Sequence, residues 1–179
     1  LFRSATLMET KKLADSENLF TKVLNVTDSV AIASLPAEMS EKYGDIDLLI
    51  NNAGIIQPFV KITDLTLDQA KKVMDVNFWG PFTLLKAFLP TLLSRPQAHI
   101  LNVSSMGAYS PEPGQSLYGA SKAAIKLLTE GLRSELLNTK VGVTVAFPGA
   151  VATNITTNSG LAMPANADEL HSAKTKAKM

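Results

Sequence analysis

The chain has 179 residues, a formal net charge of +1, 46% apolar residues and 18% charged residues. This composition is typical of one globular domain with its own core, and the near-neutral charge gives no broad basic surface for nucleic acid. The absence of cysteine excludes disulfides and cysteine zinc sites, and two isolated histidines predict no metal site. No apolar run reaches the roughly 18 residues of a membrane span, and the N-terminus lacks a signal-peptide pattern. We therefore expect a cytoplasmic protein that binds neither nucleic acid nor membrane.

Apolar runs of strand length alternate with helical patterns along the chain. The predicted strands cover residues 20–24, 46–50, 100–103 and 141–147. The predicted helices cover residues 30–43, about 67–94 and about 117–137. Asp28 or Ser29 would cap the first helix, and Pro36 should bend or shorten it.

The strand runs are nearly continuous in apolar residues, which is typical of parallel strands buried on both faces. The alternation with helices predicts an α/β fold with a doubly wound, Rossmann-like parallel sheet. Ligands of such sheets bind at the carboxyl ends of the strands, where segments 51–54, 104–107 and 148–153 should meet.

Both ends of this predicted domain, residues 1–179, look incomplete. Residues 1–4 resemble the end of a strand, and no dense glycine turn for a phosphate is present. No closing strand follows residue 158, and we expect residues 158–179 to form a substrate loop or flexible tail.

Tyr118 and Lys122 are four residues apart near the start of a predicted helix and should lie on one face. A free phenol has a pKa of about 10, and a neighbouring ammonium and the helix dipole lower that pKa. Such a tyrosine can give a proton to a carbonyl or take one from an alcohol. By itself the pair is weak evidence, because an exposed tyrosine and lysine at this spacing are usually only solvated.

Two further residues strengthen the interpretation. Ser105 follows a predicted buried strand, so its hydroxyl could bind the same substrate oxygen, although it could also merely end the strand. Asn77 lies in the long helical segment, four residues before Pro81. Because proline has no N–H, the Asn77 carbonyl loses its helical partner and could hold a water or a lysine, or simply mark a bend.

Together these motifs, with their order and spacing, resemble the short-chain dehydrogenases/reductases in their compact single-domain form. The resemblance covers residues 1 to about 158. The motifs that carry it are Asn51-Asn52-Ala53-Gly54, Asn77, Ser105, Tyr118-x-x-x-Lys122 and Pro148-Gly149-x-x-x-Thr153.

The resemblance implies hydride transfer between a nicotinamide cofactor and a small-molecule carbonyl or alcohol substrate. Tyr118 would be the acid/base, Lys122 would lower its pKa and bind the nicotinamide ribose, and Ser105 would orient the substrate carbonyl. Asn77 would hold, through its main chain, a water that links Lys122 to solvent. The remaining implied cofactor contacts are Asn51, Ala53 and Gly54 near the adenosine ribose, and Pro148, Gly149, Val151 and Thr153 at the carboxamide.

The chain departs from the family pattern in two places. Asn25-Val26 stands where an Asp-Val pair usually contacts adenine, and an amide can still pair with the adenine edge. The glycine-rich turn is missing, so we expect cofactor affinity to need residues upstream of Leu1. Arg3 follows a predicted strand end that lacks an acidic residue, which favours NADP(H) over NAD(H).

Several alternatives remain open at this stage. A sugar-nucleotide epimerase or dehydratase would share the Tyr-x-x-x-Lys motif, and a truncated chain could keep the fold as a scaffold or weak catalyst. The family also implies a homodimer or homotetramer. Apolar helix residues could form that interface or pack in the core, and they are Phe82, Leu85, Leu89, Leu92 and Leu93.

Overall fold

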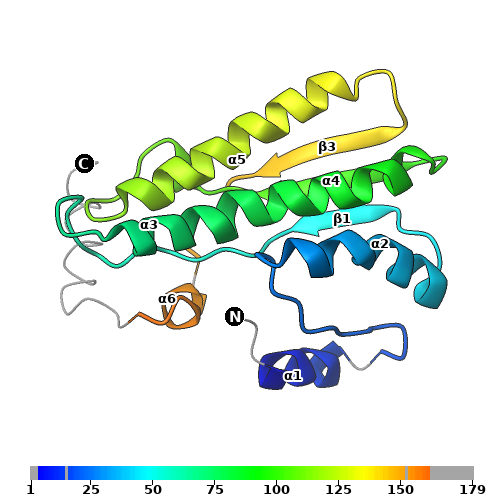
Figure 1. Cartoon of the computed structure of the whole chain (residues 1–179), viewed down its shortest axis with the longest axis horizontal. Helices are drawn as coiled ribbons and strands as arrows, with labels where there is room; N and C mark the ends of the chain where they lie inside the picture. Colours follow the sequence, from blue (N-terminus) through cyan, green and yellow to red (C-terminus); the bar gives the residue numbers. More distant parts are fainter. Residues whose placement is uncertain (1–3, 15, 152, 162–179) are drawn as a thin grey trace.

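The structure, a computed structural model, describes residues 4–14, 16–151 and 153–161. Parallel strands alternate with helices, and the predicted Rossmann-like sheet is confirmed in an incomplete form with three strands (Figure 1). The elements in chain order are α1 (Ser4–Ala14), α2 (Ser29–Tyr43), β1 (Leu48–Asn51), α3 (Leu67–Met74), the π-helical turn η1 (Asp75–Trp79), α4 (Gly80–Leu93), β2 (Ala98–Val103), the 3₁₀ turn η2 (Met106–Ala108), α5 (Ser116–Glu135), β3 (Val141–Ala146) and α6 (Ile155–Asn158).

The strand order is β1-β2-β3, with both pairs parallel. Leu48 pairs with His99 and His99 with Gly142, and the register continues without interruption to Asn51 and Asn102. Because all three strands run in one direction, their carboxyl ends share one edge of the sheet. This edge carries the loops after Asn51, Val103 and Ala146, as the sequence predicts.

Helices α4 and α5 lie side by side over one face of the sheet, with α2 packed beside α4 (Figure 1). The core between these layers consists of Leu35, Leu85, Phe88, Leu92, Ala98, Ile100, Leu132, Leu136 and Val141. Side chains of the opposite sheet face are less covered within the described residues: Leu48 and Ile50 remain about half exposed. The expectation that strand β1 is buried on both faces is therefore wrong in this part of the chain.

The predicted strand at residues 20–24 is also wrong, since this segment is irregular. Phe20 and Val23 are more than half exposed, and the Phe20 ring contacts that of Tyr43 in α2, 4.2 Å between centroids. An apolar run becomes a strand only where a neighbouring strand accepts its backbone hydrogen bonds, and the described sheet offers this segment none.

The remaining predicted helices and strands agree closely with the structure, whereas α1 and α6 were not predicted. Asp28 caps α2 by accepting a hydrogen bond from Ala31 N, and Pro36 does not shorten this helix. Residues 67–93 are helical throughout, and the π-helical turn η1 stands at the kink expected around Asn77, just before Pro81. None of the described helices is long and apolar enough to cross a membrane.

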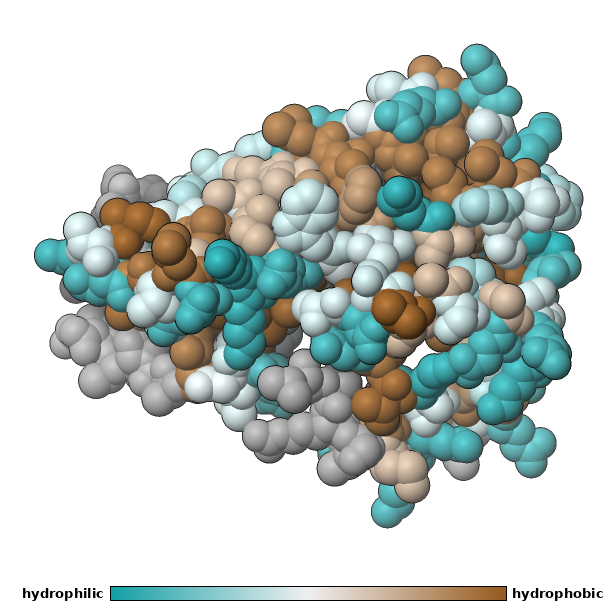
Figure 2. Space-filling model, viewed as in Figure 1, coloured by the Kyte–Doolittle hydropathy of each residue, from teal (hydrophilic) through white to brown (hydrophobic). Residues whose placement is uncertain are grey.

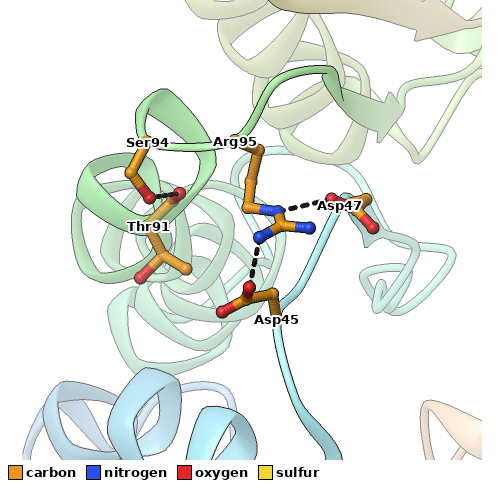
Figure 3. Close-up of polar contacts among 5 residues, drawn as sticks. All are labelled: Asp45, Asp47, Thr91, Ser94 and Arg95. Atoms are coloured by element: carbon orange, nitrogen blue, oxygen red, sulfur yellow. Dashed lines mark hydrogen bonds and ion pairs between the residues drawn. The ribbon is translucent and has the colours of Figure 1, made fainter.

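The amino ends of β1 and β2 are joined by Arg95, which follows α4 (Figure 3). Its Nε donates to Asp47 Oδ1 at 2.7 Å, and its Nη1 forms an ion pair with Asp45. Both carboxylates raise the pKa of Arg95, that of Asp47 first. This cluster lies at the end of the strands away from the loops that form the candidate site.

Candidate active site

Tyr118 and Lys122 lie in the first two turns of α5, on its inner face. Lys122 is 4% exposed, and its Nζ donates to Val103 O at 3.0 Å and lies 6.0 Å from the centroid of the Tyr118 ring. Burial lowers the pKa of Lys122 to about 8, because the ammonium loses its hydration. The lysine therefore remains mostly protonated at pH 7 and places a positive charge near the phenol.

Ser105 reaches the same place from the end of β2. Its Oγ accepts a hydrogen bond from Gly107 N at 3.0 Å, which begins the 3₁₀ turn η2. A methyl group on Gly107 would lie 3.4 Å from Ser105 Oγ and 3.3 Å from Cε1 of Tyr118. The serine hydroxyl and the tyrosine ring thus flank a single glycine, as the motif spacing predicts.

Asn77 is 1% exposed within the π-helical turn η1. Its side chain holds both backbone groups of Ile55: Oδ1 accepts from Ile55 N and Nδ2 donates to Ile55 O, each at 2.9 Å. The same Nδ2 donates to Ser121 Oγ at 2.9 Å. The side-chain amide of Asn77, and not only the main-chain carbonyl expected from the sequence, therefore joins the β1 loop to α5.

The loop after β1 borders a hollow of about 200 Å³. Its lining residues are Val26, Ile50, Asn51, Asn52, Ala53, Pro81 and Leu84. The buried Oδ1 of Asn51 has no hydrogen-bond partner among the described residues. Val26, Asn51 and Ala53 are the predicted cofactor residues that line this hollow, and their contacts with a cofactor stay predictions.

Gly54 follows in the same loop and lies against the lysine. A methyl group on Gly54 would stand 3.1 Å from Lys122 Nζ and 3.6 Å from Asn77 Oδ1. Asn25, by contrast, uses its Oδ1 to accept from the backbone and hydroxyl of Thr27. Gly54 therefore lies at the centre of the site. The side-chain oxygen of Asn25 is instead occupied by hydrogen bonds from Thr27 within a local turn.

The loop after β3 joins the site through Pro148, whose carbonyl accepts from Met106 N at 3.0 Å. Gly149, Val151 and Thr153 are exposed, so their expected cofactor contacts stay predictions. Arg3 and most of the expected substrate loop, residues 162–179, lie outside the described residues.

Several buried polar residues of the site carry no recognisable sequence motif. Ser121 Oγ donates to Tyr118 O at 2.7 Å, and Ser104 Oγ donates to Lys122 O at 2.7 Å. Gln57 is 1% exposed, and its Oε1 accepts from two backbone N–H groups at the start of α5. Polar residues at buried positions of a predicted helix or loop are the only sequence signal for such contacts.

Known proteins resemble this chain in sequence and in fold. A family model described as short chain dehydrogenase matches residues 3–163. Dehydrogenase/reductase SDR family member 7B of Mus musculus is 38% identical over 140 residues, which cover 78% of this chain and 43% of that protein. The chain thus spans less than half the length of this relative.

Two solved structures extend the comparison. The closed form of serine dehydrogenase complexed with NADP+ is 29% identical with a TM-score of 0.80, and the match covers 88% of this chain and 64% of that one. NAD+-bound xylitol dehydrogenase is 28% identical with a TM-score of 0.77, over 82% of this chain and 57% of that one. The chain therefore belongs to the short-chain dehydrogenases/reductases, a family of oxidoreductases.

Proposed function

We propose that this chain transfers a hydride between a nicotinamide cofactor and a carbonyl or alcohol substrate, with Tyr118 as acid/base. The observation that carries the proposal is the convergence of three groups from two elements. The Lys122 ammonium lies 6.0 Å from the Tyr118 ring centroid, and Ser105 and Tyr118 flank Gly107. A phenol, an ammonium and a hydroxyl that lie this close together can act on one substrate oxygen.

Each of these groups has a distinct part in the proton transfer. Tyr118 gives its proton to the carbonyl oxygen in reduction and takes it back in oxidation. The Lys122 ammonium stabilises the phenolate that remains, and its burial strengthens this interaction because little water screens it. Ser105 donates a hydrogen bond to the same oxygen and fixes its position.

The bound nicotinamide supplies the hydride, and the protein supplies orientation and charge. The hollow at Val26, Asn51 and Ala53 would hold the adenosine part, and Gly54, the next residue of this loop, lies against Lys122. Pro148, Gly149, Val151 and Thr153 would contact the carboxamide. We favour NADP(H) over NAD(H) on the basis of Arg3, and the two solved relatives above, one with each cofactor, are compatible with either choice.

We also propose a homodimer or homotetramer. Apolar surface gathers over α4 and α5 on the face shown in Figure 2, and Leu93 and Leu127 of these helices are 45% and 62% exposed. Leu85 and Leu92, in contrast, are buried in the core and are unavailable for an interface. The proposal thus rests on the outer residues of the two helices.

The experiment mixes the protein with NADPH or NADH and a panel of ketones. Loss of nicotinamide absorbance is expected with the wild type. Tyr118→Phe should lower kcat by at least about 100-fold, whereas the affinity for the cofactor and the melting temperature should stay unchanged. A Tyr118→Phe variant with wild-type turnover would exclude this tyrosine as acid/base.

A further inference from the structure

The helix that carries Tyr118 and Lys122 has an unusual N-terminus. Its N-cap residue, Gln115, makes no side-chain capping bond. Instead, Gln57 reaches across from the loop after β1, and its Oε1 accepts from Leu117 N at 2.8 Å and from Tyr118 N at 3.0 Å. These are N–H groups that an N-cap side chain normally satisfies, so a residue about 60 positions away caps this helix.

The contact between Gln57 and α5 is buried and reciprocal. Gln57 is 1% exposed and Gln115 is 4% exposed, and Gln115 Nε2 donates back to Gln57 O at 2.8 Å. The two backbone donors at Gln57 Oε1 determine which way its amide points. Gln57 Nε2 and Gln115 Oε1 have no partners among the described residues, so the acceptor oxygen is the functional atom of Gln57.

The segment that presents Gln57 is itself held by the site. The Asn77 side chain fixes both backbone groups of Ile55, two residues earlier. The same Asn77 amide donates to Ser121 Oγ, which donates to Tyr118 O. Tyr118 is thus held at its backbone N–H by Gln57 and at its backbone carbonyl by Ser121.

We propose that Gln57 is a positioning residue that fixes Tyr118 for proton transfer through its backbone N–H. This inference rests on the proposed function of Tyr118. It goes beyond the motif residues, because Gln57 belongs to none of them. Removal of the acceptor should release the first turn of α5 and shift the phenol relative to Ser105, and a displacement of about 1 Å can lower a rate by about 100-fold.

The test compares Gln57→Met, which keeps the size but removes the acceptor, with Gln57→Glu, which keeps an acceptor. Gln57→Met should lower kcat by about tenfold or more with little change in KM, and Gln57→Glu should recover most of the kcat. In Gln57→Glu the pH at which alcohol oxidation reaches half of its maximal kcat should move upward, because a nearby carboxylate opposes loss of the phenol proton.

Gln69→Met is the matched control. Gln69 Oε1 accepts from Thr66 N at 3.0 Å in the capping box of α3, so the same substitution removes an acceptor from the N-terminus of a helix whose first turn carries no proposed catalytic residue. This variant should lose stability but keep kcat and its pH profile.

Two readouts separate this inference from the proposed function. Wild-type turnover and its loss in Tyr118→Phe test the function, whereas amide hydrogen exchange at Leu117 and Tyr118 tests the cap without turnover. Exchange should accelerate in Gln57→Met and stay slow in Gln57→Glu. Unchanged exchange and kcat in Gln57→Met would overturn the inference. If Gln57→Met does not fold, an unmoved pH profile in Gln57→Glu would overturn it.

Discussion

The ammonium of Lys122 packs against the backbone of Gly54, where a methyl group would stand only 3.1 Å from Nζ. This close approach brings the end of the β1 loop to the base of the tyrosine–lysine pair. Because Nζ also donates to Val103 O at 3.0 Å, it has little freedom to move away. The glycine of the Asn-Asn-Ala-Gly motif is therefore needed for space beside the lysine.

Gly54→Ala should accordingly lower kcat/KM by about 10- to 100-fold, since a small displacement of Lys122 alters the charge beside the phenol. The free energy of unfolding should fall by about 1 kcal/mol or less, because a shift of a few tenths of an ångström relieves the contact. Steady-state kinetics and urea unfolding measure the two effects.

Gly131→Ala is the control for this prediction. Gly131 lies on α5 as well, and a methyl group there would meet nothing within 4 Å. The substitution should raise stability by about 0.5–1 kcal/mol and leave kcat/KM unchanged. Equal activity of the two alanine variants would show that the contact with Lys122 is unimportant.

Lys122 should also make stability depend on pH. Its pKa falls from 10.5 to about 8 on folding. Below pH 8 both states are protonated, and burial of the charge destabilises the folded state by about 3 kcal/mol. Between pH 8 and 10.5 the unfolded state binds the additional proton, so this penalty disappears as pH rises.

Lys122→Met should therefore be more stable than the wild type at pH 7 by up to about 3 kcal/mol. Loss of the hydrogen bond from Nζ to Val103 O offsets part of this gain. The advantage should shrink toward pH 10.5, and activity should be lost at every pH. Urea unfolding at pH 7, 8.5 and 10 provides the comparison. Lys140→Met is the control, because it removes a lysine that is exposed instead of buried. A pH-independent difference between Lys122→Met and the wild type would contradict the burial argument.

Cofactor choice provides a prediction from the sequence alone. Arg3→Ala should lower the ratio of kcat/KM for NADPH to that for NADH by about tenfold or more, because a guanidinium pairs with the 2′-phosphate. NADH kinetics should change little. An unchanged ratio would mean that another residue selects the cofactor.

Most of the strands and helices were predictable because burial imposes a visible pattern. Strands β2 and β3 and helices α2 and α5 lie within two residues of their expected ends. The prediction for residues 20–24 was wrong, since their apolar side chains look like a strand but none of the described strands pairs with this segment. An apolar run by itself shows neither that a segment is buried nor that it pairs, since Phe20 and Val23 are more than half exposed.

Some residues of the candidate site could likewise be predicted from the sequence, and others could not. Tyr118 and Lys122 were predictable because helical spacing places them together, and Ser105 because it ends a strand. Gln57 was not, since its contact with Tyr118 N crosses 61 residues and depends on the path of two loops. Asn77 was predicted for its carbonyl, while its side-chain bonds to Ile55 depend on how the π-helical turn approaches the β1 loop.

A row of buried polar groups connects the sheet to α5 and should contribute strongly to stability. Asn51 Nδ2 donates to Asn102 Oδ1 at 2.8 Å, Asn102 Nδ2 donates to Thr129 Oγ1 at 2.9 Å, and that hydroxyl donates to Ile125 O. Asn102 is 0% exposed, so its removal leaves a buried donor and a buried acceptor without their partner.

Asn102→Ala should thus lower the free energy of unfolding by about 2–4 kcal/mol, through the lost bonds and the cavity. Exposed Asn138→Ala should stay within about 0.5 kcal/mol of the wild type. Urea unfolding of both variants measures the difference. Because Asn51 borders the proposed adenosine hollow, Asn102→Ala should also weaken cofactor binding, which fluorescence titration with NADPH detects. Similar stability of the two alanine variants would show that the row of hydrogen bonds is dispensable.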